Sequence, residues 1–426
     1  MTKKIAIIGS GISGLSLAWL LNKKYDVTLF EKESTLGGHA NTVDVDYPNG
    51  LSGEKISVDT GFIVYNFRTY HHLKQLFEFL KIEICESKMS FGIKDYASGI
   101  EYVGSNLSGV FAQKRNLLNP LFLLMIFDIL KFNKNAIKLI ENNSEIEDSL
   151  TLEEFVNRLK LGKYFKQYYL FPMASAIWSC PIDQMKLYPA KTFLRFFYNH
   201  GLLTITNQPQ WYSVKNGSRE YVKKLSAEFA DKIKLNSEIK KCFEGSNGIN
   251  LEDVLGNKYQ FDHVIFASHA DETFKIISDK TSEESRILSK FKFSQNLAVL
   301  HRDEKQMPKN KNAWASWVYL SSPKNSKTSL SYWMNNLQAI EQKFPLFVTL
   351  NPIEKVDPSK VFGTFKYSHP IFDFDAISAQ SEISSIQGKR NIWFAGAWLK
   401  YGFHEDGISS AIEIANKFEV FAPWQK

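Results

Sequence analysis

The sequence predicts an α/β protein with two domains, one built in three layers around a parallel sheet and the other an α+β domain inserted into it. Its 426 residues are more than one hydrophobic core usually serves. Residues 4–8 form a short apolar run that ends in glycines, and a helical pattern and a second apolar run at residues 26–30 follow it. After a stretch from about 70 to 210 with a mostly helical pattern, residues 290–370 show the alternation typical of strands.

The composition is that of a globular protein, with 44% apolar, 23% charged and 14% aromatic residues. Cys85, Cys180 and Cys242 form no CxxC pair, so we expect neither disulfides nor a metal site, and a cytoplasmic location fits best. The net charge of +7 comes from scattered lysines, which argues against a nucleic-acid partner and is compatible with peripheral contact to an anionic membrane. The sequence contains no run of 18 apolar residues, so we expect no membrane-spanning helix.

A glycine-rich turn follows the first apolar run. Gly9, Gly11 and Gly14 have the GxGxxG spacing that turns the chain tightly, exposes bare backbone to a pyrophosphate and lets the next helix pack on the strand. The N-terminus of that helix would face the phosphates with its partial positive charge. Glu31 lies 20 residues after Gly11, where its carboxylate can accept hydrogen bonds from ribose hydroxyls. These features in register predict a dinucleotide site, against the alternative of a glycine turn without a ligand.

Two further glycine segments favour FAD over NAD. Gly37 and Gly38 follow the acidic residue and let a second loop approach the same pyrophosphate. Late in the chain, Gly396 ends another predicted strand, and residues 402–407 lead into a last helix expected to begin at Gly407. The N-terminus of this helix would lie at the pyrimidine edge of the flavin, where negative charge develops on reduction. The sequence therefore predicts a Rossmann-like, discontinuous FAD-binding domain.

The chain resembles a known family in five segments, at residues 7–14, 36–41, 58–66, 193–202 and 401–407. These segments are similar to those of the flavin-containing amine oxidase superfamily, and within it to a bacterial group of predicted NAD/FAD-binding oxidoreductases. The resemblance covers nearly the whole chain. It implies an FAD-binding domain formed by residues 1–70, 210–285 and 385–426, and a substrate-binding domain formed by residues 71–209 and 286–384.

The motifs and the resemblance together give a set of expected cofactor contacts. By the resemblance, Ile239 would touch the adenine end through its backbone, and Ala267 and Ser268 would pass beside the dinucleotide. The full set is Gly9, Gly11, Ile12, Ser13, Gly14, Glu31, Lys32, Gly37, Gly38, His39, Thr60, Gly61, Phe62, Ile239, Ala267, Ser268, Gly396, Ala397, Glu405, Asp406, Gly407 and Ile408.

Several positions depart from the pattern of this superfamily. His39 stands where an arginine usually follows the glycine pair, and it supplies no permanent charge. Ala397 stands where an acidic residue usually follows the late glycine. No cysteine lies near the C-terminal motif, so we expect FAD to bind non-covalently. The paired tyrosines that sandwich an amine in this superfamily have no counterpart here, since only Tyr401 lies close to the motif, which puts amine oxidation in doubt.

His404 and Tyr401 are the expected catalytic residues, because both lie in the turn that should face the flavin. His404 could shuttle a proton, or alternatively pin the turn through hydrogen bonds. Arg195, His200 and Phe403 are the expected substrate contacts, with a structural ion pair as the alternative for Arg195. Besides contacting the cofactor, Glu405 and Asp406 are expected to serve as an N-cap and a turn anchor.

Residues 117–132 form the most apolar stretch, which predicts a fully buried helix that lines the substrate cavity, or alternatively a helix that dips into a membrane surface. The resembled superfamily includes fatty-acid double-bond isomerases and desaturases that act on methylated acyl chains. This resemblance, the apolar stretch, the high aromatic content and the missing amine cage together lead us to expect hydride transfer to flavin N5 from a hydrophobic or acyl-lipid substrate. The expected substrate is an unsaturated or methylated fatty acyl chain, and the expected reaction is desaturation or double-bond isomerisation. The substrate cavity should then be mostly apolar. The alternatives are an amine oxidase that produces imine and hydrogen peroxide, and a non-catalytic flavoprotein.

Overall fold

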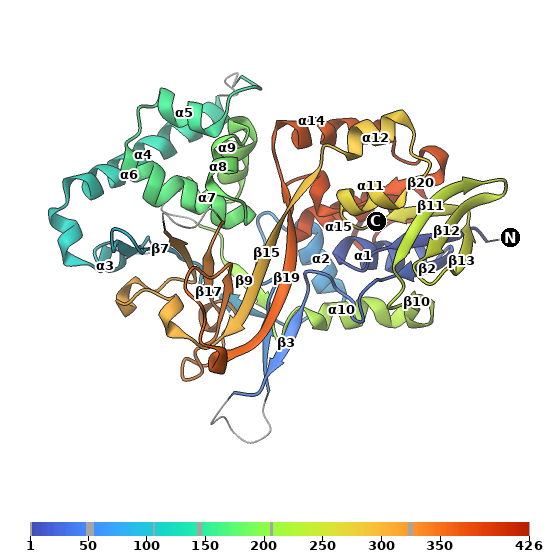
Figure 1. The fold of residues 1–426 in the computed structure, drawn as a ribbon, viewed down its shortest axis with the longest axis horizontal. Coiled ribbons are helices and arrows are strands. Elements are labelled where there is room, and N and C mark those ends of the chain that lie inside the picture. The colour runs from blue at the N-terminus through green and yellow to red at the C-terminus, as the bar shows by residue number, and fades with distance from the viewer. Residues whose placement is uncertain are drawn as a thin grey trace.

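A parallel sheet forms the centre of one half of the molecule (Figure 1). The computed structural model describes residues 2–47, 55–104, 107–142, 147–204, 208–322 and 327–425. Within them, five strands pair in the order β10-β2-β1-β14-β20, and every neighbouring pair is parallel. The strands are β1 (Lys4–Ile8), β2 (Asp26–Phe30), β10 (Ile233–Lys234), β14 (His263–Phe266) and β20 (Ile392–Phe394). The expected Rossmann-like α/β fold is confirmed, because strands from distant segments meet in this one sheet.

Alternate residues of β1 enter different cores, which explains why the strand reads as a continuous apolar run. Ile5 and Ile7 pack into a cluster shared with helices, whereas Ala6 and Ile8 pack into a cluster on the opposite face. The first layer contains α1 (Ile12–Leu21), α2 (His71–Phe79), α10 (Arg219–Ser226) and α15 (His404–Lys417). The opposite layer contains β11 (Ile239–Gly245), β12 (Gly248–Asp253), β13 (Lys258–Phe261), α11 (Ala270–Ile276), α12 (Ser282–Leu288) and α14 (Phe374–Glu382).

The other half contains a second sheet, and the described strands run in the order β19-β15-β18-β17-β16-β7-β8. They are β7 (Phe91–Asp95), β8 (Glu101–Val103), β15 (Lys292–His301), β16 (Trp317–Ser321), β17 (Leu330–Trp333), β18 (Phe347–Leu350) and β19 (Val361–Ile371). The pairing of β16 with β7 is parallel and the other pairings are antiparallel. The sheet shares one hydrophobic core with the surrounding helices (Figure 1). The domain limits expected from the sequence stay a prediction.

The remaining elements connect or cover these sheets. The helices are α3 (Leu107–Val110), α4 (Pro120–Glu141), α5 (Leu152–Arg158), α6 (Lys163–Phe165), α7 (Phe171–Trp178), α8 (Ile182–Lys186), α9 (Ala190–Asn199) and α13 (Met334–Leu337). The strands are β3 (Thr42–Val45), β4 (Ile56–Asp59), β5 (Tyr65–Asn66), β6 (Ile84–Ser87) and β9 (Trp211–Val214). The stretch from 70 to 210, expected to be mostly helical, therefore also contributes strands β6, β7 and β8. Helix α15 begins at His404 rather than at Gly407, because the carboxylate of Asp406 accepts from the N–H of Phe403 and closes the first turn.

The expectation of a fully buried helix at residues 117–132 is wrong. One side of α4 enters the core through Phe122, Met125 and Phe132, while Leu124 and Phe127 on the other side are 57% and 67% exposed. The 3.6-residue period divides the apolar residues between two faces, which composition alone does not reveal. Among the described residues, no helix is both long enough and apolar enough to cross a bilayer.

Candidate active site

The glycine turn after β1 has the geometry of a pyrophosphate cradle. The N–H of Gly9 donates to the carbonyl of Phe30, and its φ of +102° is one that L side chains rarely adopt. A Cβ on Gly14 would lie 1.8 Å from the carbonyl oxygen of Gly9, so this position holds α1 against the turn. In contrast, a Cβ on Gly11 would meet no heavy atom within 4 Å. Open space therefore lies over Gly11, where the backbone and the N-terminus of α1 can approach a phosphate.

The second glycine pair lies directly against this turn. The N–H of Gly37 donates to the carbonyl of Ser10 over 3.1 Å, and a Cβ on Gly38 would lie 3.3 Å from the Cα of Gly11. Two glycine loops thus border the same space, as the sequence predicts for FAD. Glu31 orients the first loop, since its Oε2 accepts from both the N–H and the hydroxyl of Ser10 at 2.9 and 2.6 Å.

The segment from Thr60 to Phe62 supports the loop that carries His39. The N–H of Phe62 donates to the carbonyl of His39 over 2.7 Å, and a Cβ on Gly61 would lie 2.3 Å from that same oxygen. The Thr60 hydroxyl lies 2.7 Å from the hydroxyl of Tyr367 on β19. These expected contacts are therefore gathered around the second glycine loop.

Three histidines from separate segments gather beside this loop. The ring of His39 lies 5.3 Å from that of His369 and 6.3 Å from that of His269, between centroids. Burial lowers the pKa of His369 to about 4, and burial together with the neighbouring histidines holds the pKa of His39 well below its usual value. Three neutral imidazoles therefore stand where the superfamily usually has one arginine, and each can give a hydrogen bond to a phosphate oxygen.

The first turns of α1 and α15 lie side by side. The hydroxyl of Ser13 donates to the carbonyl of Gly407 over 3.0 Å, and a Cβ on Gly407 would lie 2.7 Å from Cγ2 of Ile12. Ile408 is buried in the same core as α1. The N-terminal ends of both helices therefore point their partial positive charge toward one region, as binding of an anionic dinucleotide requires.

The other expected cofactor contacts lie at the edges of this region. Ala267 and Ser268 follow β14, and a Cβ on Gly9 would lie 2.9 Å from the carbonyl oxygen of Ala267. The N–H of Gly396 donates to the hydroxyl of Ser410, and Ala397 follows in a short turn. Farther out, Ile239 is buried at the start of β11, and Lys32 forms an ion pair of 2.6 Å with Glu272.

His404 is enclosed by aromatic side chains. Its ring stacks on Phe62 with centroids 3.8 Å apart, and its Nε2 lies 3.1 Å from the hydroxyl of Tyr221. Burial lowers the pKa of His404 to about 3, so the ring is neutral near pH 7. This packing favours the alternative in which His404 pins the turn. Its role in proton transfer stays a prediction.

Glu405 and Asp406 anchor the turn, and one of them does so in an unexpected way. Glu405 accepts from the N–H groups of His72 and Leu73 at 2.9 and 3.0 Å, so it caps α2 rather than its own helix. Burial raises the pKa of Glu405 to about 7 and that of Asp406 to about 6. Both carboxyl groups therefore titrate near neutral pH.

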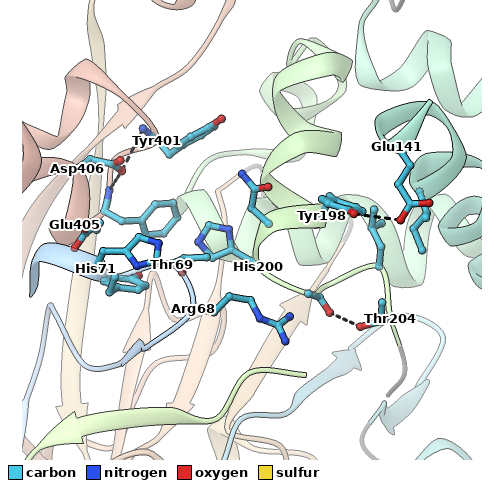
Figure 2. A pocket seen from close by; sticks show the side chains of 16 residues that line it. Arg68, Thr69, His71, Glu141, Tyr198, His200, Thr204, Tyr401, Glu405 and Asp406 are labelled. Atoms are coloured by element: carbon cyan, nitrogen blue, oxygen red, sulfur yellow. Dashed lines mark hydrogen bonds between the residues drawn. The ribbon is translucent and has the colours of Figure 1, made fainter. Parts of the chain in front are cut away.

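A cavity of about 670 Å³ opens beside this turn (Figure 2). Tyr401, Phe403 and His200 line it, as expected, together with Glu405 and Asp406. His200 stacks on Phe196 with centroids 3.8 Å apart, and burial lowers its pKa to about 4. Sequence reasoning missed the remaining lining residues, which lie in loops and at helix ends without a motif: Arg68, Thr69, Tyr70, His71, Ile137, Glu141, Tyr198, Asn199, Gly201, Leu203 and Thr204.

Two expectations about this cavity need correction. Its lining is mixed rather than mostly apolar, because the loop that follows α9 and the turn before α2 bring polar side chains to it (Figure 2). Arg195 is exposed on α9, is absent from the lining, and forms no ion pair with a described residue. Its side chain lies on the outer face of this helix, because buried Phe193, Leu194 and Phe196 occupy the inner face.

Residues 12–307 match the model of the flavin containing amine oxidoreductase family. The chain belongs to this family. It is 24% identical to amine oxidase [flavin-containing] A of Bos taurus over 287 residues, which are 64% of this chain and 50% of that protein. It is 43% identical to the uncharacterized protein R656 of Acanthamoeba polyphaga mimivirus over 49 residues, 11% of this chain and 10% of that protein. The chain thus spans no more than half the length of these relatives.

Solved structures with the same fold cover nearly the whole chain. The CLA-producing fatty acid isomerase from P. acnes has a TM-score of 0.67 and 14% identity, with 98% of both chains covered. The putative protoporphyrinogen oxidase from Exiguobacterium sp. 255-15 has a TM-score of 0.67 and 15% identity, over 98% of this chain and 99% of that one. Putrescine oxidase bound to putrescine has a TM-score of 0.68 and 12% identity, with the same coverage. At these identities the likeness establishes the fold alone.

Proposed function

We propose that this protein binds FAD non-covalently and takes a hydride from an amphiphilic substrate with an unsaturated or methylated fatty acyl chain. The flavin would keep the hydride in a desaturation, or return it at another carbon in a double-bond isomerisation. Bound flavin supplies the hydride acceptor for such chemistry. The observation that carries the proposal is the cavity of about 670 Å³ beside the C-terminal glycine turn. Its size lies within the usual range for a small-molecule site.

The glycine turns support FAD as the particular flavin. The space over Gly11 is bordered by Gly38 and by the first turns of α1 and α15, which suits a pyrophosphate between two nucleotide halves. Glu31 holds a carboxylate at the end of β2, where a ribose would lie. The resemblance to the superfamily, which implies FAD, supports the same proposal.

The state of the thiols supports non-covalent binding. Burial raises the pKa of Cys180 and of Cys242 to about 12, so neither forms the thiolate that attack on a flavin would require. Cys85 lies on β6, where its sulfur contacts the hydroxyl of Ser213.

The two ends of the cavity differ in character, which suits an amphiphile. At the end that adjoins the cofactor region, Tyr401 and Phe403 pack against Phe196, with centroids 5.6 and 5.2 Å from that ring. At the other end, Arg68 and Thr204 offer polar groups near the surface (Figure 2). An acyl chain would lie among the aromatic rings while its carboxylate or phosphate head group meets the guanidinium.

Proton transfer from the substrate fits Glu405 best. This carboxyl group lines the cavity, and burial raises its pKa to about 7, close to the value at which a group both accepts and returns protons at neutral pH. His404, the candidate from the sequence, has a pKa of about 3 and does not line the cavity. We therefore place proton transfer on Glu405 and keep His404 as the alternative.

Amine oxidation is the second candidate, because Tyr198 and Tyr401 both line the cavity and two rings can receive an amine. The carboxyl groups nearby favour the acyl chain, however. Glu405 and Asp406 already accept backbone N–H bonds, so their oxygen atoms are engaged in anchoring the turn and α2 rather than open to a substrate cation. A flavoprotein without catalytic activity is the third candidate.

Anaerobic mixing of the holoenzyme with each substrate class separates the candidates. Desaturation of an unsaturated or methylated acyl lipid bleaches the flavin absorbance and yields a product two mass units lighter. Isomerisation leaves the absorbance and the mass unchanged but moves the double bond. Rapid bleaching by putrescine or another simple amine, without any change in acyl lipids, would refute the acyl-chain proposal. No reaction with either class would favour the non-catalytic flavoprotein.

A further inference from the structure

The N-terminal half of α4 and the segment before it present large apolar side chains to solvent. Leu118 is 88% exposed, Phe127 67% and Leu124 57%. We call the group of Leu117, Leu118, Leu121, Leu124, Phe127 and Leu130 the α4 apolar face. The spacing of three or four residues places the α4 members on one side of the helix, opposite the buried Phe122 and Met125. A contiguous apolar surface of this kind marks a contact with another apolar phase.

The lysine and arginine side chains around the α4 apolar face are not paired with carboxylates in the described part of the chain. Lys114 and Arg115 precede it, and Lys131, Lys134 and Lys138 continue the same side of α4 toward its C-terminus. None of these five forms an ion pair with a described residue. The acidic residues of the segment are used elsewhere: Asp128 accepts from the N–H of Gly162, and Glu141 accepts from the Tyr198 hydroxyl. The surface is therefore apolar and basic, the combination that complements an anionic lipid surface.

The same helix leads to the cavity. Ile137 and Glu141, in the last turns of α4, line the cavity of the proposed active site. Figure 1 shows α4 at the far end of the molecule from the five-stranded sheet, so a surface that docks there leaves the nucleotide-binding half outside the bilayer. A lipid leaving the bilayer beside α4 would reach the cavity along one helix.

We propose that the α4 apolar face docks on a membrane containing anionic phospholipid, so that the enzyme takes an acyl chain of a bilayer lipid as its substrate. This source of substrate rests on the proposed function, whereas docking itself does not. The leucine and phenylalanine side chains enter the boundary between head groups and acyl chains. The lysines that follow remain at the level of the phosphates, with their hydrocarbon stems along the apolar surface.

Co-sedimentation of the holoenzyme with vesicles tests the docking. The vesicles contain saturated diether phosphatidylcholine and phosphatidylglycerol in equal parts, or phosphatidylcholine alone, so that no ester or double bond is available for turnover. We expect binding to the anionic vesicles, weakened at least tenfold by the double substitution Leu118→Ser and Phe127→Ser. Lys131→Gln with Lys134→Gln should weaken binding to anionic vesicles and reduce its dependence on salt.

Leu255→Ser is the matched control, because Leu255 is 79% exposed in the turn between β12 and β13 in the other half of the molecule. This variant should bind vesicles as the unchanged protein does, and flavin content verifies that every variant is folded. Equal binding by all variants, or no binding by the unchanged protein, would overturn the proposal. A dimer in solution that is lost on Leu118→Ser and Phe127→Ser, without vesicle binding, would assign the face to a second copy instead. Vesicle binding without any reaction on acyl lipids would retain the docking and refute the proposed function.

Discussion

Replacing Gly11 with valine should weaken FAD binding strongly while leaving the fold intact. In the structure a Cβ at this position meets nothing within 4 Å, and the backbone, at φ −65° and ψ −178°, suits any L-residue. The free energy of unfolding of the apoprotein should therefore change by no more than about 1 kcal/mol. The new side chain occupies the space where a pyrophosphate would approach the backbone, and overpacking of this kind costs about 1–3 kcal/mol. Because 1.4 kcal/mol is a factor of ten in affinity, FAD binding should weaken roughly fivefold to more than a hundredfold.

The matched control is Gly14→Ala, one turn further along the same helix. Its Cβ would lie 1.8 Å from the carbonyl oxygen of Gly9, so the turn must move before the methyl group fits. This variant should lose thermal stability in the apoprotein as well as FAD. Titration of apoprotein with FAD, followed by flavin fluorescence, measures the affinity, and thermal unfolding without flavin measures the fold. Full FAD affinity in the Gly11→Val protein, or loss of its apoprotein fold, would refute the placement of the cofactor over this turn.

The remaining predictions concern flavin attachment, the pH dependence of stability and the proton-transfer group. Acid or heat should release the flavin as free FAD, since the buried thiols of Cys180 and Cys242 stay protonated; flavin that remains on the denatured chain would contradict this. The free energy of unfolding should fall as the pH drops from about 6.5 toward 4, because burial lowers the pKa of His200 and His369 to about 4 while unfolded histidine keeps a value of about 6.5. Each of these histidines should lower the free energy of unfolding by about 2 kcal/mol by pH 5. Denaturant titrations at pH 7, 6 and 5 should show this loss, and His200→Gln should reduce it. A denaturation midpoint that does not depend on pH would argue against buried neutral imidazoles. The rate of flavin reduction should rise with pH through about 7, the value to which burial raises the pKa of Glu405. Glu405→Gln should remove this rise in rate with pH, whereas His404→Asn should keep both the rise and the bound FAD. The reverse pattern would assign the proton transfer to His404.

The elements that could be predicted from the sequence are those fixed by residues close together in the chain. The strand at residues 4–8, the glycine turn and Glu31 follow from spacing, because backbone sterics at Gly9 and packing at Gly14 leave few alternatives. The cofactor region predicted from these motifs is gathered in one place by the parallel sheet. Prediction from the sequence therefore succeeded where the residues that determine the structure all belong to one βαβ unit.

The parts that could not be predicted depend on contacts between distant segments. His39, His269 and His369 meet only because β14 and β19 bring their loops together, and no spacing in the sequence relates them. The cap that Glu405 provides to α2 joins residues more than 330 positions apart. The face of α4 that stays exposed is likewise decided by which of its apolar side chains find partners in the core, and both faces carry enough leucine and phenylalanine to look buried.

The position of β20 determines when the half of the molecule built around the five-stranded parallel sheet can be completed during synthesis. Strand β14 pairs on one side with β1 and on the other with β20, and α15 then packs against α1. A nascent chain that has left the ribosome only as far as β19 lacks both the last strand of this sheet and the second helix that faces the cofactor region. Until then, the edge of β14 is an unpaired strand that can associate with other chains. A flavin site that needs both elements is therefore complete only after β20 and α15 have been synthesised and have packed against β14 and α1.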